Sequence, residues 1–465
     1  MFSKVLGLYL ILVSSATFAS WDGAKRSYEQ KRSRSKMENM VVELVNGGFS
    51  YSALPMMKEY LISETRNLSS KMDLILSRMI GEVGVKQFET LPYRYLIRSK
   101  SNNIRYIIAK KYMREQKYNK SLTYLNKISS DHSVYPFAKN MQATIEAIGG
   151  KSSKAQATFK ECVVASNNKL SDSPSNRRLK LNRDYCTVGI ARSQFAARKF
   201  SDADLLYLDI PKSSMIWPEI LFEEAWNSYY QKNYNRTLGK LVSYKAPVFE
   251  HIFNPEIEVL SALTYLKLCL FQDAKKISND FYKKNLRDTR RLRLYLKKNK
   301  RNYTKYYDLM VKYQQNGKGS PSLVRSLLSS IEREESFVDS RNQLSTAAKE
   351  YDSVRAQSSS KFKRFIIQNI QEALRSHKKI MGASIRGKMV SHYAQLYKAF
   401  EGMSYIKLEV LAQRKAKLYS FEEGTRARGD IKYIQRNEKQ YFWDFNGEFW
   451  ADELGDYVFA LKSEC

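Results

Sequence analysis

Small and aromatic residues recur between positions 105 and 281 at a spacing close to the length of two paired helices. Five windows each carry an alanine, an aromatic or small residue nine positions later, and a small residue twelve positions later. Subtracting successive alanine positions gives spacings of 34, 48, 34 and 37 residues. Two small residues at these places let paired helices approach closely, while the residue between them fills the turn. The five sets of packing residues are Ala109, Tyr118 and Ser121; Ala143, Ser152 and Ala155; Ala191, Phe200 and Ala203; Ala225, Tyr234 and Thr237; and Ala262, Phe271 and Ala274.

Residues 111–125 carry a tyrosine, a short polar turn, an aromatic residue and then a small residue that opens the next helix. This segment resembles the tetratricopeptide repeat (TPR), and residues 191–207 look like a second copy. The turn glycine of that repeat occurs only as Gly150, and its terminal proline is mostly missing. The resemblance implies a TPR-like α-solenoid over residues 104–313, with a concave surface for a peptide or helix. The alternative is an irregular helical domain in which the period arises by chance.

Residues 20–103 also read as helical, with the weak periodicity expected of a divergent repeat at the end of a solenoid. A run rich in glycine and polar residues at 314–322 predicts a domain boundary. Beyond it, in the region 323–420, apolar residues alternate at spacings of three and four, which is typical of coiled-coil helices. We expect two or three long helices folded back on each other. The seams are Ile366, Ile370, Ala373, His377 and Ile380, and, in another frame, Ile385, Met389, His392, Leu396, Ala399, Met403, Ile406 and Val410.

The tail, residues 421–465, is aromatic and acidic. Asn446 and Gly447 between aromatic residues predict a β-hairpin with a type I′ turn. We expect the tail to dock its tryptophans on the long helices or the solenoid and to offer an acidic counterpart to the basic block at 283–312, or to act as a partner-binding tag. Its clustered carboxylates favour a solvated edge over a catalytic pair. The fold class is therefore all-α: a solenoid, long coiled-coil-like helices and a short tail with a hairpin.

Residues 1–19 have the pattern of a signal peptide. Lys4 is followed by an apolar run at 5–13 and by Thr17-Phe18-Ala19, a small-residue cleavage site. The run is too short to span a bilayer comfortably, which disfavours the alternative of a retained anchor. We expect a periplasmic or secreted protein that is soluble after cleavage.

Four cysteines follow, at 162, 186, 269 and 465. An oxidising compartment favours pairing, although four cysteines allow three connectivities. We favour a disulfide between Cys162 and Cys186, at the base of the polar excursion 166–176; Cys269 and Cys465 form the weaker second pair, and buried free thiols are the alternative. The cysteine spacing and four dispersed histidines match no zinc site, so we expect no metal and no cofactor.

The formal net charge is +32, which favours acidic or polyanionic partners. Its densest block, residues 283–312, holds seven lysines and five arginines against Asp288 and Asp308, with tyrosines interleaved. In a cytoplasmic protein this would favour single-stranded nucleic acid, but export argues against that partner. The remaining candidates are anionic lipid, anionic cell-wall polymer and acidic protein surfaces. A solvated helical face without a ligand is the alternative.

Residues 328–337 are similar to the glutamate–serine motif of lytic transglycosylases, enzymes that cleave murein. The resemblance implies Glu335 as general acid and base and Ser336 as a substrate-positioning residue. The Gly-Leu-Met-Gln segment that follows in that family is missing here. We therefore favour a non-catalytic scaffold with no small-molecule substrate. The layout and the ending at 447–455 resemble secreted TPR proteins of gliding and predatory Gram-negative bacteria, which implies an envelope adaptor in a motility or envelope-spanning assembly.

Overall fold

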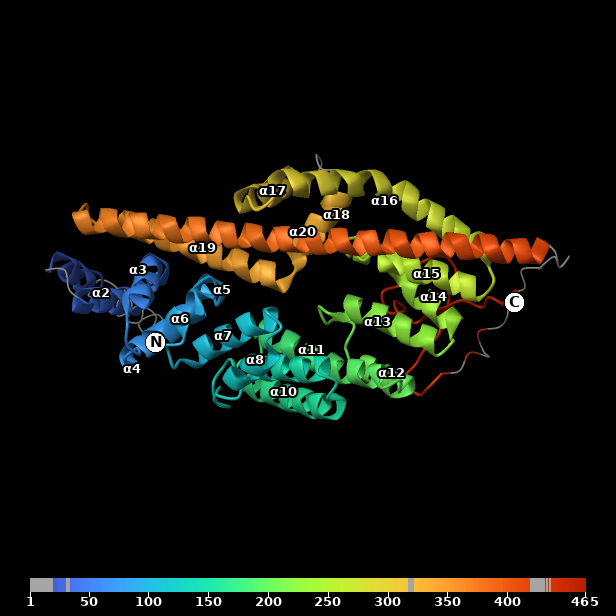
Figure 1. Ribbon diagram of the computed structural model, residues 1–465, viewed down its shortest axis with the longest axis horizontal. Coiled ribbons are helices and arrows are strands. Elements are labelled where there is room, and N and C mark those ends of the chain that lie inside the picture. The colour runs from blue at the N-terminus through green and yellow to red at the C-terminus, as the bar shows by residue number, and fades with distance from the viewer. Residues whose placement is uncertain (1–19, 31–33, 317–321, 419–430, 432–433, 435) are drawn as a thin grey trace, which may run out of the picture. The chain divides into compact units, whose positions relative to one another are not determined.

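The computed structural model of the 465-residue chain is almost entirely helical (Figure 1). It describes residues 20–30, 34–316, 322–418, 431, 434 and 436–465. The expected signal peptide, residues 1–19, lies outside this part of the chain. The sheet found within it has two short strands, β1 (Trp443–Asp444) and β2 (Tyr457–Val458). The prediction of an all-α protein is confirmed.

The chain divides into two compact units, each built from two separate stretches of sequence. Unit 1 comprises Met1–Ile145 and Glu335–Ser384, and unit 2 comprises Glu146–Glu334 and Ile385–Cys465. The sequence placed its boundaries near residue 103 and at 314–322 instead, and 317–321 lie outside the described residues. The division differs because the C-terminal helices join each earlier part of the chain through long-range packing, which leaves no mark in local composition.

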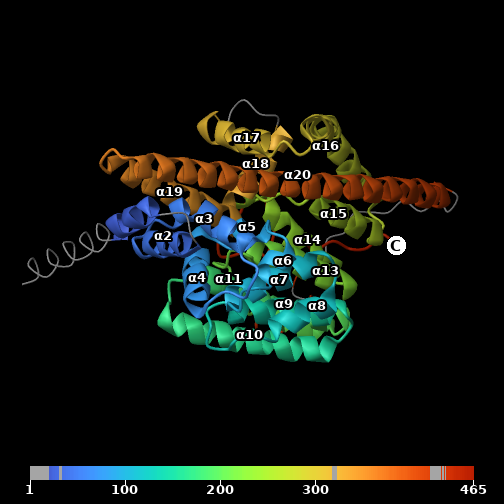
Figure 2. The same ribbon diagram turned by 60° about the vertical axis from the view of Figure 1, so that its left-hand side comes forward.

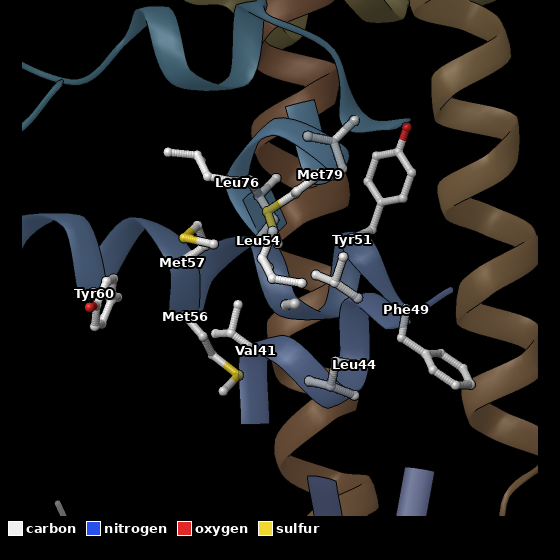
Figure 3. Close-up of a cluster of buried hydrophobic side chains, with 14 of the residues drawn as sticks. Val41, Leu44, Phe49, Tyr51, Leu54, Met56, Met57, Tyr60, Leu76 and Met79 are labelled. Carbon is white, nitrogen blue, oxygen red and sulfur yellow. The ribbon is translucent and has the colours of Figure 1, made fainter. Parts of the chain in front are cut away.

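Most helices of unit 1 pack around one apolar core (Figure 3), and Leu125 and Ala138 belong to a second, smaller apolar cluster of the same unit. Residues 20–29 are helical, and the helices that follow are α2 (Arg34–Asn46), α3 (Ser50–Ser63), α4 (Ser70–Val83), α5 (Lys86–Glu89), α6 (Tyr93–Leu96), α7 (Asn102–Arg114), α8 (Tyr118–Leu125), α19 (Glu335–Ala356) and parts of α9 (Tyr135–Ile148) and α20 (Lys361–Leu418). Figure 3 shows Leu54, Leu76 and Met79 close together where α3 meets α4. Phe362 and Ile366 of α20 are buried in the same core, so the C-terminal stretch completes it.

Unit 2 contains most of the recurring helix pairs. Its elements, besides the remainders of α9 and α20 and the two strands, are α10 (Ser152–Asp172), α11 (Arg177–Ala196), α12 (Phe200–Tyr207), α13 (Trp217–Tyr230), α14 (Tyr234–Val242), η1 (Ser243–Lys245), η2 (Pro247–Phe249), α15 (Glu256–Lys267), α16 (Phe271–Asn299), α17 (Tyr303–Asn316) and α18 (Ser322–Arg333). In both ribbon views α16 and α17 lie next to α20 at the outer edge of this unit (Figures 1 and 2).

The first and third residues of all five sets in the recurring pattern are buried. The middle residue of each set begins the second helix of a pair, as Tyr118 begins α8 and Phe200 begins α12. Ser152, Tyr234 and Phe271 do the same for α10, α14 and α16. The small residues with 0 % exposure are Ala109, Ser121, Ala143, Ala155, Ala191, Ala203, Ala225, Thr237, Ala262 and Ala274.

Every helix pair turns through a left-handed residue at the same place, seven positions after its first alanine. Gly150 has φ +73°, and four non-glycine residues have φ between +57° and +61°. The residue after each donates its N–H to a carbonyl five positions back, as Lys117 does to Tyr112 at 2.9 Å. This bond and the left-handed residue are those of a Schellman cap, which satisfies the last carbonyls of the first helix. The four non-glycine residues are Gln116, Arg198, Lys232 and Cys269.

The face of α20 expected to form a coiled-coil seam is buried. In unit 1, residues 366, 370, 373 and 377 are buried and Ile380 is half-buried; in unit 2, all eight seam residues from 385 to 410 are buried. The partner in unit 2 is α16, from the last helix pair. Phe400 packs edge-on against Phe281 with ring centroids 5.0 Å apart, and Met403 meets Ser278 at 3.4 Å.

The two seam histidines occupy core positions. In unit 1, both ring nitrogens of His377 have partners: the carbonyl of Ser340 at 2.8 Å and the side-chain amide of Gln87 at 2.9 Å. In unit 2, His392 stacks edge-on against Phe253 with centroids 4.8 Å apart. Burial lowers the pKa of each imidazole. Both side chains are therefore neutral packing residues at neutral pH.

The predicted hairpin in the tail is wrong. β1 and β2 pair in parallel, with Trp443 opposite Tyr457, so the chain does not reverse tightly at Gly447 although that residue has φ +101°. The reason is that β2 also packs against α14, and this contact, instead of a tight turn at Gly447, sets the position of β2. The tail tryptophans are not buried: Trp443 and Trp450 are 46 % and 59 % exposed, whereas Tyr457 is 1 % exposed.

Candidate functional site

A cavity of about 630 Å³ opens in unit 2 between the tail and the segment from α12 to α13. This volume lies within the range of ordinary ligand sites. We call it the tail cleft. Its walls are Leu208, Asp209, Ile210, Lys212, Trp217, Glu224, Lys439, Tyr441, Trp443, Asp452, Leu454, Gly455 and Asp456.

Two glycines let the tail backbone lie directly on the helices that form the cleft. A β-carbon on Gly239 of α14 would overlap the main-chain carbonyl of Tyr457. Gly455, at φ +90°, has its α-carbon so close to α13 that a β-carbon would stand 2.9 Å from the ring of Trp217. The N–H of Gly455 also donates to the Ser243 hydroxyl at 2.9 Å. These contacts set the position of the cleft wall that the tail supplies.

Hydrogen bonds to Asn235 of α14 hold the end of the tail. The side chain of Asn235 donates to the carbonyl of Leu461 and accepts from its N–H, both at 3.0 Å. The N–H of Phe459 donates to the carbonyl of Asn235 at 3.3 Å. Further on, Cys465 forms a disulfide with Cys269 at the turn between α15 and α16. The last residues of the tail, 459–465, are therefore held against α14 and the turn between α15 and α16.

Two exposed ion pairs lie across the cleft. Lys212 contacts the carboxylate of Asp456 at 2.9 Å and the carbonyl of Asp452, and Lys439 contacts Asp209 at 2.9 Å. The side chain of Lys212 is 43 % exposed, and those of Lys439 and Asp209 are 47 % and 49 % exposed. Exposed pairs of this kind contribute about 0–1 kcal/mol each. They open at little cost and expose both an ammonium and a carboxylate to a ligand.

Buried polar contacts fix the framework beneath these pairs. Lys240 donates to Glu224, which borders the cleft, and both side chains are almost inaccessible. Asp204 accepts from Arg236 at 2.8 Å and from the side-chain amide of Gln440 at 2.7 Å. Removing one partner of a buried pair costs about 3–5 kcal/mol. This network therefore anchors the tail immediately before its first cleft aromatic residue.

Aromatic and apolar surface supplies the other half of the cleft. Tyr441 is 68 % exposed and Trp443 is 46 % exposed, whereas Trp217 and Leu454 are each 7 % exposed. Large aromatic faces with low conformational entropy are favoured at recognition surfaces, especially beside polar groups that fix orientation. The tail cleft thus combines an apolar floor, an open aromatic rim and reversible ion pairs, which suits a peptide segment that carries an apolar side chain between charges.

None of the packing residues expected from the repeat pattern lines the cleft; they build the helix pairs that carry it. The sequence pattern does not identify the cleft residues themselves. The sequence does show a cluster of aromatic residues in the tail. Because large aromatic side chains usually pack in a core, that cluster favours packing over a binding site. Lys212 and Asp456 are 244 positions apart, and no local pattern relates them.

The glutamate and serine of the motif, Glu335 and Ser336, lie at the beginning of α19 in unit 1. Glu335 is the first residue of the helix and is half-buried, and Ser336 is exposed with its carbonyl accepting from the Ser340 hydroxyl at 2.8 Å. Neither residue lines the tail cleft. The motif and the cleft are therefore separate features of the molecule.

All four cysteines are in disulfides, which are Cys162–Cys186 and Cys269–Cys465. The first is the pair favoured from the sequence, and it joins α10 to α11 across the polar segment between them. The second is the pair that the sequence indicated more weakly. Both lie within unit 2.

A second cavity, of about 350 Å³, lies in unit 1 where α19 faces the beginning of α3. Its most buried charged group is Glu350, which accepts the N–H groups of Tyr51 and Ser52 at 3.0 and 2.6 Å. Burial raises the pKa of this carboxyl to about 7, although these hydrogen bonds favour its ionised form. The remaining walls are Gly47, Gly48, Phe49, Thr346, Lys349, Ser353 and Gln357.

No cluster of histidine, cysteine and carboxylate side chains within the described ranges could hold a metal ion. Of the helices that the structure describes, none has the length and hydrophobicity needed to cross a bilayer. A comparison with protein-family models and with curated proteins finds no match to this sequence.

Proposed function

We propose that the protein is a non-catalytic adaptor of the cell envelope that binds a segment of a partner protein in the tail cleft. The observation that carries this proposal is the open aromatic rim, formed by Tyr441 and Trp443, beside two exposed ion pairs. These groups offer contact and orientation to a peptide without having to move any buried element.

The framework around the cleft supports binding over reaction. Schellman-capped helix pairs, the buried network at Asp204 and the disulfide at Cys269 hold both walls in place. A preformed site loses less conformational entropy on binding than a flexible one. Rigid walls with a few adjustable charges at the rim are the properties that an adaptor needs.

The setting of this adaptor is the periplasm or the cell exterior. The signal-peptide pattern of residues 1–19 and two disulfides support it, since disulfides persist in oxidising compartments. The resemblance to secreted TPR proteins of gliding and predatory bacteria adds a motility or other envelope-spanning assembly as the place of action.

Two tryptophans of the tail make a matched test of this proposal. Trp443 lines the cleft, and Trp450 is also exposed but does not. A photoreactive amino acid is placed at one or the other position in the native host, and crosslinked peptides are identified by mass spectrometry. We expect one recurring partner peptide at position 443 and its absence at position 450.

Reversing one charge at the rim of the cleft provides a second test of the same proposal. Lys439→Glu removes one rim pair and should reduce the yield of that crosslink about five-fold or more, as expected for a charged contact worth about 1 kcal/mol. Equal crosslinking at positions 443 and 450, or a yield at 443 that Lys439→Glu leaves unchanged, would exclude the tail cleft as the binding site.

A further inference from the structure

From Lys283 to Lys298, the outward side of α16 carries a cationic surface. The helix has 29 residues and is about 43 Å long at 1.5 Å per residue. Its inward side buries Phe281, Asn285, Thr289 and Leu292. At 3.6 residues per turn, the exposed residues fall within about half of the helix circumference, opposite that buried side. The exposed cations are Lys283, Lys284, Arg287, Arg290, Arg291, Arg293, Lys297 and Lys298.

Most of these charges are unneutralised. Lys284 contacts Glu258 at 2.9 Å, and Arg291 contacts Asp288 at 3.4 Å. Among the residues that the structure describes, the other six have no recorded ion pair. Exposed cations continue past the turn into α17, at Lys300, Arg301, Lys305 and Lys312. Unpaired charges of one sign on one rigid face produce a field that attracts an extended anionic surface.

Two tyrosines of this block, Tyr295 and Tyr306, pack against each other and are not available for stacking. Tyr306 is 0 % exposed and packs edge-on against Tyr295, with ring centroids 5.7 Å apart. Their hydroxyls donate to the carbonyls of Lys300 and Lys305, at 3.2 and 3.3 Å. Binding of single-stranded nucleic acid relies on aromatic rings that can stack with bases. Tyr295 and Tyr306 instead fix the turn between α16 and α17, so they do not offer their rings to the bases of a single-stranded nucleic acid.

Two leucines are exposed among the cations. Leu294 is 65 % exposed and Leu286 is 38 % exposed. Arg290, Arg291, Lys297 and Lys298 flank Leu294 at the spacings of three and four that place residues side by side on a helix. A polysaccharide or a nucleic acid would use only the charges. The interface of a bilayer accepts both, because headgroups pair with cations while apolar side chains enter the acyl boundary.

We propose that this outward face of α16 binds the surface of an anionic phospholipid bilayer, peripherally and independently of the tail cleft. Each lysine or arginine close to such a surface strengthens binding about five-fold. The leucine at the centre of the face adds a contribution that salt does not screen. The two sites together would hold a partner protein beside a membrane.

The test is co-sedimentation of the purified protein with vesicles of phosphatidylcholine alone or mixed with phosphatidylglycerol. We expect binding to the mixed vesicles and none to phosphatidylcholine alone. The quadruple variant Arg287→Glu, Arg290→Glu, Lys297→Glu, Lys298→Glu should bind at least about ten-fold less. The control reverses four exposed cations elsewhere in unit 2 and should bind as the wild type does; its substitutions are Lys151→Glu, Lys160→Glu, Lys180→Glu and Lys199→Glu.

Leu294→Gln distinguishes a bilayer from other polyanions. It should weaken vesicle binding about five-fold, because a partly inserted leucine contributes on the order of 1 kcal/mol, and it should leave binding to single-stranded DNA unchanged. The thermal unfolding midpoint of each variant checks its fold, and Lys297→Glu with Lys298→Glu repeats the test with a smaller change. Equal losses in the quadruple variant and its control, or vesicle binding insensitive to Leu294→Gln, would overturn the proposal.

Discussion

Gly239 of α14 and Tyr457 of β2 touch through their main chains. A β-carbon on Gly239 would overlap the carbonyl of Tyr457 and stand 2.8 Å from the α-carbon of Val458. Only glycine permits this approach. The contact joins two segments more than two hundred positions apart and places the tail wall of the cleft on the helix pairs.

Gly239→Ala should therefore detach β2. Alanine normally stabilises a helix interior relative to glycine by about 0.5–1 kcal/mol, but here the added methyl group meets a backbone that cannot rotate away. We expect a net loss of about 1–3 kcal/mol in the unfolding free energy of unit 2, as for other overpacked sites. Limited proteolysis should cut the tail of the variant faster.

The matched control is Gly387→Ala. This glycine lies within α20, and a β-carbon added to it would have no atom of the described residues within 4 Å, its own helix backbone and chain neighbours aside. The ordinary helix preference should apply there, with a gain of about 0.5–1 kcal/mol. If both substitutions stabilise the protein, β2 does not lie on α14 in solution.

Reduction should loosen unit 2 more than unit 1, because all four bridged cysteines are in unit 2. The bridged cysteines are 24 and 196 residues apart. The chain-entropy relation assigns about 3.5 kcal/mol to the shorter loop and about 5 kcal/mol to the longer. Hydrogen exchange with and without reductant measures the effect by peptide. An equal loss of hydrogen-exchange protection in both units would contradict this prediction.

Unit 1 should lose stability as pH rises from about 4.5 to about 7. Burial keeps the Glu350 carboxyl protonated in the folded state up to a pKa of about 7, whereas its ordinary value is 4.5. The folded state holds more protons in this window, so the free energy of unfolding falls with rising pH. The 2.5-unit difference corresponds to a loss on the order of 3 kcal/mol, complete above pH 7.

Glu350→Gln should flatten that dependence, because the amide keeps an acceptor for the N–H of Ser52 and has no charge to bury. Glu59→Gln, at an exposed position of α3, serves as the control and should keep the slope. Thermal midpoints of unit 1 across this pH range provide the measurement. A slope that survives in Glu350→Gln would assign the titration to another group.

The left-handed turn residues offer a test of the equivalence of the helix pairs. Lys232→Gly should stabilise the protein by about 0.5–1 kcal/mol, because glycine adopts positive φ without a steric cost. Gly150→Ala should destabilise it by a similar amount, since Gly150 has the same role in another pair. Urea denaturation measures both. A loss of stability in Lys232→Gly would show that its turn differs from the others.

The helix pairs were predictable because their packing residues are local. The alanine period located the five turns, but it did not reveal their left-handed backbone conformation. In four of the turns the residue with positive φ is not of a type that signals it; these residues are Gln116, Arg198, Lys232 and Cys269. The hydrogen bonds of the Schellman cap, which any residue can make, hold them in place. The alternating spacing along α20 likewise located its buried face, whereas its partner in unit 2, α16, could not be read from that spacing.

The tail was predictable only in part, because its partner is not its neighbour in sequence. Asn446 and Gly447 predicted a hairpin, but β2 packs against α14, and Tyr457 pairs with Trp443 in parallel. The size of Trp443 favours packing, yet the buried anchor is Tyr457. The cleft depends on residues near positions 210, 224 and 455, which only the folded chain brings together.

The adaptor proposal rests on the claim that the rim of the tail cleft contacts a partner. The most direct measurement is the dissociation constant of the partner peptide identified at position 443, titrated against wild type, Trp443→Ala and Trp450→Ala. Truncating an aromatic anchor costs about 2 kcal/mol or more, so Trp443→Ala should raise the dissociation constant at least about ten-fold. Trp450→Ala should leave it within about two-fold, since that residue lies outside the cleft. Equal affinity for all three proteins would contradict the claim.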